Sequence, residues 1–347
     1  MSEPEVLFAV KGDRASITLN RPKALNALNH AMVLEITARL HDWAGDDAVR
    51  EVVISGAGEH AFCAGGDVVG IAKRILAGEV GTGLSANFFR EEYRLNRIIR
   101  TYPKPYLAIL DGITMGGGVG LSIHGRYRIA TDRTVLAMPE MAIGFFPDVG
   151  GGYALARFPG KSGLYMALSG ARARAADCLY VGAATHYVSD GNLAKLVDAI
   201  NSAPIETLLD TYAEDPGPPP MRERQALIDR CFAGGSVEAI LAALDAEGGE
   251  WAEKTAATLR HVAPLSLKVA HRQLTEAAGL EFDANMVMEY RLCQRFMAGH
   301  DFCEGVRAVL IDKDKAPAWR PASLDAVGDE TVDAYFAPLG ERDLTFD

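Results

Sequence analysis

The sequence predicts an α/β protein with a helical C-terminal region. The N-terminus alternates apolar and polar residues on both sides of Gly12-Asp13, as a β-hairpin does. Two short apolar runs, 52–54 and 106–110, have the length of buried strands and alternate with helical patterns, which is typical of an α/β core. The pattern changes near residue 205. We therefore divide the chain into a core with the active site, 1–205, and a helical region, 206–347.

Turn and capping residues place the first elements. The hairpin strands are marked by Val6, Phe8 and Val10, and by Ala15, Ile17 and Leu19. Asn29 can cap the helix that follows, because its side chain can accept a hydrogen bond from a free backbone N–H. That helix has an apolar stripe at helical spacing, formed by Met32, Val33, Ile36, Leu40 and Trp43.

Later elements follow the same logic. Residues 61–67 form a glycine-rich loop, and residues 88–100 have a helical pattern. The glycines at 116–118 open a predicted helix that runs through His124. Strands are predicted at 127–130 and 134–138. After EDPGPPP, which reads as a loop, helices are predicted at 223–232, 236–246, 250–261, 265–278 and 284–298.

Composition excludes several classes of protein. The 347 residues can bury a large core, and the net charge of −11 argues against general nucleic-acid binding. No segment reaches the roughly 18 apolar residues of a membrane-spanning helix. Five cysteines without a C-x-x-C pair and eight scattered histidines indicate reduced thiols and no metal site. The acidic start lacks a secretory signal, so a cytoplasmic enzyme is expected.

Two glycine-rich turns are candidates for oxyanion binding. Gly65-Gly66 and Gly116-Gly117-Gly118 each follow an apolar strand. Backbone N–H groups at a helix start lack partners, and two of them aimed at one point can hold a developing oxyanion. The alternative is a pair of tight turns required by packing alone.

Carboxylates in apolar surroundings form a second set of candidates. Glu140 and Asp148 lie among Phe, Ile and Gly residues, which predicts partial desolvation and altered pKa values. Glu91 and Glu92 are neighbours on a predicted helix, so their side chains point about 100° apart and only one can face a site. A solvated loop and a solvated helix face are the respective alternatives.

Basic residues are a third set. Arg21 lies close to Lys23, and Lys313 lies close to Lys315. Such charges usually face solvent. They could also meet an anionic ligand such as the phosphates of coenzyme A.

The combination of motifs resembles the crotonase, or enoyl-CoA hydratase/isomerase, superfamily. The resemblance implies a spiral of ββα units followed by helices, binding of acyl-CoA thioesters, and an oxyanion hole made by the N–H groups of Gly66 and Gly117. Relatives of this kind often form trimers or hexamers, so a homo-oligomer is a possible state. The matching segments are LNRPKALNAL (19–28), AFCAGGD (61–67), GITMGGGVG (112–120) and PEMAIGFFPDVGGG (139–152).

Within the superfamily, the chain is most similar to the hydrolases that act on 3-hydroxyisobutyryl-CoA in valine catabolism. The resemblance implies that Glu140 activates water or attacks the thioester, that Asp148 assists it, and that Glu92 receives the substrate hydroxyl. It also implies substrate contacts at Lys23 and Ala64, and no cofactor beyond the coenzyme A of the substrate. The matching segments are FFREEY (88–93), GITMGGGVGLSIHG (112–125), PEMAIGFFPDVGGGY (139–153), MEYRL (288–292) and GHDFCEGVRAVLIDKDKAPAW (299–319).

One departure separates the chain from hydratases. The resemblance places Gly120 where a hydratase has its second catalytic glutamate. Hydrolysis is therefore favoured, and an enoyl-CoA hydratase or isomerase on the same fold is the alternative. A non-enzymatic binding protein of this fold is a third interpretation, disfavoured because the glycines and both carboxylates are present.

Overall fold

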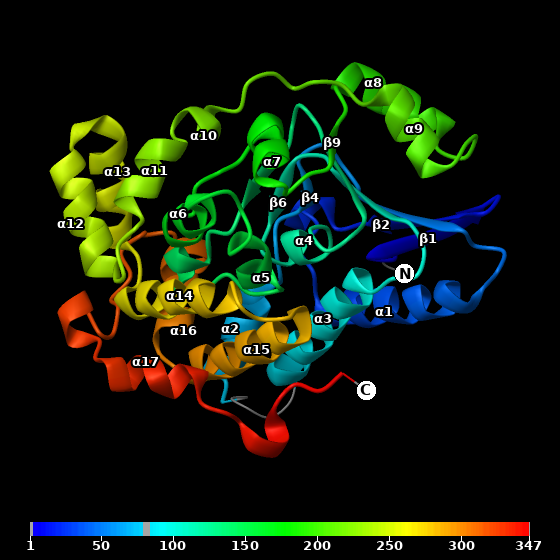
Figure 1. Ribbon diagram of the computed structural model, residues 1–347. Coiled ribbons are helices and arrows are strands. Elements are labelled where there is room, and N and C mark those ends of the chain that lie inside the picture. The colour runs from blue at the N-terminus through cyan, green and yellow to red at the C-terminus, as the bar shows by residue number, and fades with distance from the viewer. Residues whose placement is uncertain (1–2, 79–83, 347) are drawn as a thin grey trace. The chain divides into compact units, whose positions relative to one another are not determined.

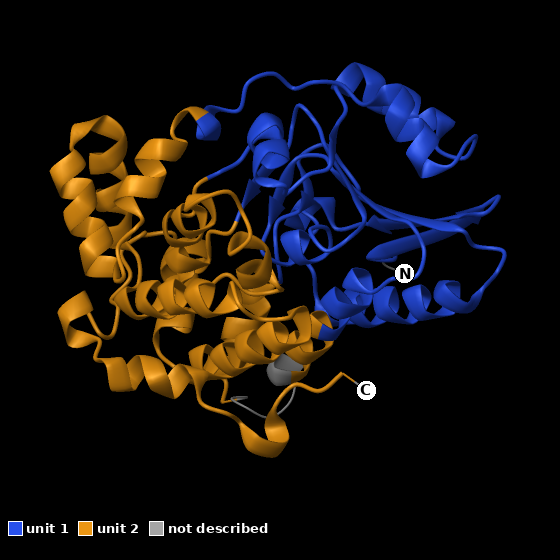
Figure 2. Ribbon diagram, in the orientation of Figure 1, with its two compact units in different colours: residues 1–66, 94–137, 172–222 blue, residues 67–93, 138–171, 223–347 orange. Residues whose placement is uncertain are grey.

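The computed structural model describes residues 3–78 and 84–346, which form two compact units (Figure 2). Unit 1 comprises Met1–Gly66, Arg94–Ala137 and Arg172–Arg222, and unit 2 comprises Asp67–Tyr93, Met138–Ala171 and Glu223–Asp347. The units interleave along the chain. The boundary near residue 205 that the sequence suggests is therefore not the boundary between these units, and it stays a prediction about where strands give way to helices.

Every strand of the described chain lies in unit 1, in two sheets (Figure 1). The larger sheet has the order β1-β2-β3-β5-β7-β9, in which only β1 and β2 are antiparallel. The smaller sheet, β4-β6-β8, is parallel throughout. The strands are β1 (Val6–Lys11), β2 (Arg14–Leu19), β3 (Glu51–Gly56), β4 (Ala61–Cys63), β5 (Tyr106–Leu110), β6 (Ile113–Met115), β7 (Tyr127–Ala130), β8 (Val135–Ala137) and β9 (His186–Tyr187).

The N-terminal hairpin and its helix confirm the sequence prediction. Lys11 pairs with Arg14 across a two-residue turn in which Gly12 has φ of 65°, a conformation that glycine adopts without strain. Helix α1 (His30–Gly45) begins after Asn29, whose side chain accepts a hydrogen bond from the Met32 N–H at 3.0 Å. All five residues of the predicted apolar stripe of α1 are buried.

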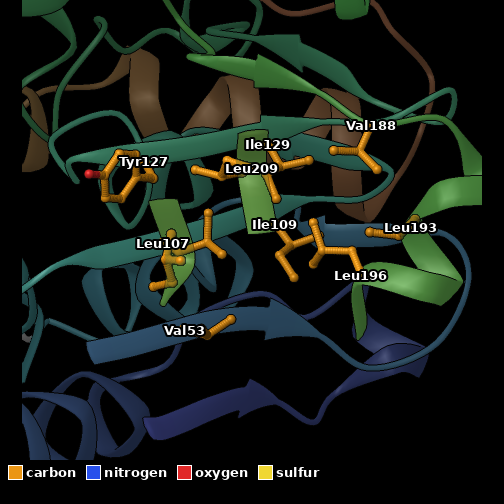
Figure 3. Packing of buried hydrophobic residues seen from close by; sticks show 10 residues of the cluster. Val53, Leu107, Ile109, Tyr127, Ile129, Val188, Leu193, Leu196 and Leu209 are labelled. Atoms are coloured by element: carbon orange, nitrogen blue, oxygen red, sulfur yellow. The ribbon is translucent and has the colours of Figure 1, made fainter. Parts of the chain in front are cut away.

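Helices pack on one face of the larger sheet. Leu107 and Ile109 of β5 point to the same face as Tyr127 and Ile129 of β7, because side chains alternate along a strand. This face packs against α8 and α9 through Leu196 and other residues (Figure 3). The helices of unit 1 are α1, α4 (Gly117–Gly120), α7 (Ala175–Val181), α8 (Asp190–Ala199), α9 (Ile205–Tyr212) and the 3-10 turn η1 (Pro22–Ala24); α10 (Pro220–Glu223) lies at the unit boundary.

Helix α4 is shorter than the sequence predicts. It ends at Gly120 instead of running through His124, and turns follow. The Ser122 hydroxyl donates to the carbonyl oxygens of Gly118 (2.8 Å) and Val119 (3.1 Å). Such side-chain bonds compete with the backbone hydrogen bonds that would continue a helix.

All regular elements in the described part of unit 2 are helices, and loops connect them. The five predicted C-terminal helices are present as α11 to α15, with ends within about two residues of those expected. Helix α3 passes from unit 2 into unit 1 after Tyr93. The remaining bounds are α2 (Val68–Leu76), α3 (Leu84–Arg100), η2 (Glu140–Ile143), α5 (Gly151–Leu155), α6 (Ser162–Ser169), α11 (Gln225–Cys231), α12 (Val237–Glu247), α13 (Gly249–His261), α14 (Pro264–Ala277), α15 (Phe282–Ala298), α16 (Asp301–Val306), η3 (Arg307–Ile311), η4 (Leu324–Ala326), α17 (Asp329–Phe336) and η5 (Gly340–Arg342).

Two further predictions can be compared with the structure. The five cysteines are buried and form no disulfide bond with one another, as the sequence indicates. Within residues 3–78 and 84–346, no helix combines the length and the apolar character needed to cross a membrane.

Close packing of Gly118 against β4 gives a test of unit 1. A Cβ at position 118 would overlap the carbonyl oxygen of Cys63, which belongs to the backbone and cannot move alone. We expect Gly118→Ala to destabilise the protein by about 1–3 kcal/mol, the usual cost of overpacking. Denaturant unfolding measures the loss.

Gly191→Ala is the matched control, because nothing lies within 4 Å of a Cβ placed at that helical glycine. It should be neutral or slightly stabilising. Equal stability of the two variants would contradict the packing described for Gly118.

Candidate active site

Five carboxyl side chains are buried in unit 2, and all but Asp301 interact with one another electrostatically as one group. Glu92 lies on α3, Glu140 begins η2, Asp148 lies in the loop before α5, and Glu289 lies on α15. Their exposed fractions are 2%, 6%, 5% and 0%. Carboxylates are almost never buried to this extent without a special role or partner, so we treat this group as the candidate catalytic centre.

Asp148 is the electrostatic centre of the group. Burial and the charge of Asp148 raise the pKa of Glu92 and of Glu140 well above that of an ordinary glutamate. Burial also raises the pKa of Asp148 to about 7, although the hydroxyl of Tyr93, which donates to Asp148 Oδ2 at 2.9 Å, lowers it. Burial and mutual repulsion therefore disfavour the state in which all three groups are ionised together.

Two oxygen atoms of the group face no protein donor. Within the described part of the chain, Glu92 Oε1 and Glu140 Oε2 are buried and have no hydrogen-bond partner. Native proteins pair most buried polar atoms, and exceptions mark sites that bind or react. Both oxygens are therefore free to meet a substrate or water.

Phenylalanine side chains make the surroundings of the group apolar. Phe145 lies in the segment between Glu140 and Asp148, and its ring centroid lies 5.8 Å from that of Phe89, 5.6 Å from that of Phe296 and 5.4 Å from that of Phe302. Phe146 stacks on Phe296 at 5.4 Å. Phe145 and Phe146, which make this segment unlike a solvated loop in the sequence, thus pack in the core of unit 2.

The backbone after Asp148 is held in an uncommon conformation. Val149 and Gly150 both have positive φ, 54° and 78°, and for a β-branched residue such as Val149 this is costly. Glu289 binds this turn: Oε2 accepts the N–H of Gly150 at 2.7 Å, and Oε1 accepts the N–H of Gly152 at 3.0 Å. Burial raises the pKa of Glu289 to about 8, and the N–H donors oppose this rise.

Sequence reasoning missed Glu289, although the segment around it was noted. The available signal was spacing: Asn285, Glu289 and Cys293 are four residues apart, lie on one face of α15 and are all fully buried. Glu91, by contrast, is partly exposed whereas Glu92 is buried, as the rotation between helix neighbours requires.

The glycine turns lie together in unit 1. A Cβ placed at Gly65 would lie 3.9 Å from the Gly117 nitrogen, so the turn before α4 is adjacent to the turn after β4. In the described chain, the N–H groups of Gly66 and Gly117 donate to no other backbone group. Gly117 is the first residue of α4, where unpaired N–H groups are expected. Two amides are thus available to a ligand.

The segment 19–28 holds the first glycine turn in place. The buried Asn26 side chain donates to the carbonyl oxygens of Ala57 (2.9 Å) and Ala61 (2.8 Å). Leu28 N–H donates to Gly65 at 2.8 Å, and Ala64 N–H donates to Leu25 at 3.0 Å. These two backbone hydrogen bonds hold the turn immediately before Gly66 and so help to orient the amide of Gly66.

The two other residues predicted to contact the substrate differ in their exposure to solvent. Ala64 is partly exposed, and Lys23 is exposed on η1. Arg21, its basic neighbour, is instead engaged with the Ala27 carbonyl at 2.6 Å and with Glu5 at 3.0 Å. Of this basic pair, Lys23 is therefore the one open to an anionic ligand.

Within the described residues, the structure shows no group of three His, Cys, Asp or Glu side chains suited to a metal ion. The expectation that the reaction needs no metal stays a prediction.

Comparison with known proteins places these features in a family. The enoyl-CoA hydratase/isomerase family matches residues 14–336. Proteins named 3-hydroxyisobutyryl-CoA hydrolase, mitochondrial, are 49% identical in Danio rerio and 46% identical in Gallus gallus, over 98% and 99% of this chain and 91% of each relative. A solved structure titled carnitinyl-CoA dehydratase, from Mycobacterium thermoresistibile, has a TM-score of 0.94 and 43% identity, covering 99% of both chains.

These comparisons correct one prediction and confirm another. The cytoplasmic assignment is wrong, because the similar curated proteins are mitochondrial by name. Targeting segments are removed from mature proteins, so the N-terminal residues of a sequence do not identify its compartment. The predicted α/β fold of crotonase type is confirmed by the full-length structural similarity. The chain therefore belongs to the enoyl-CoA hydratase/isomerase family.

Proposed function

We propose that the protein hydrolyses short β-hydroxyacyl-CoA thioesters, with 3-hydroxyisobutyryl-CoA as the main substrate, in valine catabolism. The observation that carries the proposal is the buried pair Glu140 and Asp148 in a chain with glycine at position 120. This pair can activate water or attack a carbonyl, but the second glutamate of a hydratase is missing. The names of the similar curated proteins support the same reaction.

The amides of unit 1 are proposed to bind the thioester carbonyl. The N–H groups of Gly66 and Gly117 would donate to its oxygen, which gains negative charge when the carbonyl carbon is attacked. Loss of one such donor typically costs about 2.7–4 kcal/mol of transition-state stabilisation. Glycine at both positions lets the backbone approach the ligand closely.

Glu140 is proposed as the group that starts the reaction. As a general base it would take a proton from water, whose oxygen then forms the new bond to the carbonyl carbon. As a nucleophile it would form an anhydride, which water then hydrolyses. In both routes the carbon–sulfur bond breaks, and the CoA thiolate takes up a proton. Asp148 would orient the water or share a proton with Glu140, because the charge of Asp148 raises the pKa of Glu140.

The remaining site residues are proposed to bind the substrate. Glu92, with its unpaired Oε1, would accept a hydrogen bond from the 3-hydroxyl group. Lys23 and Ala64 would contact the coenzyme A portion. Hydrolysis consumes only water, so we propose no cofactor apart from the coenzyme A of the substrate. A homo-oligomer, and the lack of nucleic-acid and membrane partners, stay predictions.

One observation favours a second function. The structurally similar Mycobacterium thermoresistibile protein is titled a dehydratase. Hydration or dehydration of an acyl-CoA is therefore the alternative, although Gly120 supplies no carboxylate for a two-glutamate mechanism. A binding protein without activity is disfavoured, because Glu140 and Asp148 are both present and both buried.

An assay of three thioesters tests the proposal. Release of free CoA thiol should be fast with 3-hydroxyisobutyryl-CoA and slow with isobutyryl-CoA and crotonyl-CoA. The enoyl absorbance of crotonyl-CoA, followed in the same samples, reports hydration. Efficient hydration of crotonyl-CoA without thiol release would establish the alternative, and no reaction with any of the three would overturn both.

The charge of Asp148 should set the pH dependence of the wild-type enzyme. A carboxyl with a pKa of about 7 is protonated below pH 7, so kcat/KM should fall as the pH decreases through that value. In Asp148→Asn the negative charge that raises the pKa of Glu140 is gone. The acidic limb of the pH profile of the residual activity should therefore move to lower pH. Measurement of kcat/KM from pH 5 to 9 shows this shift.

Asp325→Asn, the same change at an exposed position, is the control and should leave the profile unmoved. An acidic limb that stays in place or moves to higher pH in Asp148→Asn would contradict the coupling.

Glu92 should determine selectivity for the hydroxylated substrate. A buried carboxylate arranged for a hydroxyl is left unpaired by isobutyryl-CoA, which costs about 1–3 kcal/mol or more. Glu92→Ala should therefore reduce the ratio of kcat/KM for 3-hydroxyisobutyryl-CoA to that for isobutyryl-CoA, mainly by slowing the hydroxylated substrate.

The neighbouring variant Glu91→Ala should keep the wild-type ratio, because Glu91 is partly exposed on another face of α3. If Glu92→Ala also keeps that ratio, Glu92 does not bind the hydroxyl.

A further inference from the structure

Glu289 is a buried carboxyl that the proposed reaction does not use. It is fully buried on α15. Burial of a carboxyl is unfavourable unless hydrogen bonds satisfy it. Its location beside the Asp148 loop calls for a role.

The Glu289 carboxyl oxygens act as acceptors in four hydrogen bonds. Oε2 accepts the Gly150 N–H, and Oε1 accepts the Gly152 N–H. Oε1 also accepts from the side-chain amides of Asn285 at 2.8 Å and Gln273 at 3.3 Å. The carboxyl group thus joins α14 and α15 to the start of α5, which both helices contact (Figure 1).

The glycines of the loop are required by this contact. A Cβ at Gly152 would lie 2.8 Å from Glu289 Oε1 and 2.5 Å from Gln273 Nε2. Any side chain there would push the carboxylate away from the backbone. Val149 keeps a left-handed φ of 54°, a conformation that persists only when surrounding contacts impose it. The two N–H bonds to Glu289 are contacts of that kind.

Gln273 fixes the other side of Asp148. Its Nε2 donates to the Pro147 carbonyl at 2.7 Å and also reaches Glu289. Gln273 thus holds Pro147, immediately before Asp148, and Glu289 holds Gly150, two residues after it. The two side chains are joined to each other by a hydrogen bond. The Asp148 backbone has little freedom between these two anchors, and its carboxyl is directed to the Tyr93 hydroxyl.

We propose that Glu289, with Gln273, is a positioning residue that holds the Asp148–Val149–Gly150 turn, and so sets the position of the Asp148 carboxyl for the reaction. The proposal rests on the proposed function only for its kinetic consequence. The structural consequence, a fixed turn, can be measured without any substrate.

The variant Glu289→Gln tests this role with little change in volume. A glutamine has one acceptor oxygen and presents an NH₂ group to the second backbone N–H, so one donor loses its partner. We expect a folded protein with kcat reduced by about 10²-fold, the loss that a displacement of about 1 Å can cause, and with KM little changed. Glu281→Gln, the same substitution at the exposed residue before α15, should behave as wild type.

A double mutant separates positioning from a general structural effect. If Glu289 acts through Asp148, adding Glu289→Gln to Asp148→Asn should cause no further loss of kcat, because the two changes act on one unit. Independent, multiplying losses would overturn the proposal. Should Glu289→Gln fail to fold, Gln273→Met removes the other anchor and must give the same non-additive result.

Hydrogen exchange measured by mass spectrometry gives the readout that needs no activity. Glu289→Gln and Gln273→Met should exchange faster in peptides that cover residues 147–155, and Glu281→Gln should not. Unchanged exchange in that segment would refute the fixed turn. The wild-type protein could fail to release CoA while the two variants still exchange faster in that segment. That result would support the fixed turn and reject only the proposed function.

Discussion

The burial of several carboxyl groups at one place is the constraint on which unit 2 depends. Glu92, Glu140 and Asp148 cannot all be ionised in apolar surroundings, and in the described chain no lysine or arginine is among the charges that shift their pKa values. Protonation of one or more of the three groups removes this difficulty. The same arrangement gives the site groups that accept and release protons near neutral pH, which thioester hydrolysis requires.

Much of the neighbouring structure can be understood as support for this group. Phe145 and Phe146 exclude water beside it, and the glycines at 150 and 152 bring the backbone against Glu289. The amides of Gly66 and Gly117 belong to a separate support, in which Asn26 and Leu28 fix one glycine turn. Two kinds of chemistry, hydrogen-bond donation and proton transfer, thus come from two differently built parts of the chain.

The sequence predicts those features that depend on local pattern. The hairpin at Gly12, the cap at Asn29 and the helices of the C-terminal region follow from turn chemistry and periodicity, and all are present. The interleaving of the two units could not be predicted, because it depends on contacts between distant segments. Glu289 was missed because a buried glutamate in a helix has the same sequence pattern as a solvent-exposed one. The loop that binds it, at Gly150 and Gly152, is distant in the sequence. The early end of α4 coincides with hydrogen bonds from the Ser122 hydroxyl to the backbone of α4, which the sequence pattern does not announce.

The central claim, that burial and the charge of Asp148 raise the pKa values of the buried carboxyls of unit 2, can be measured directly. In protein labelled with ¹³C at the aspartate and glutamate carboxyl carbons, NMR titration from pH 3 to 9 would follow each group. The account predicts that at least two carboxyl resonances titrate well above pH 5 and that Asp148→Asn shifts the remaining ones to lower pH. Titration of every carboxyl below pH 5 would contradict it.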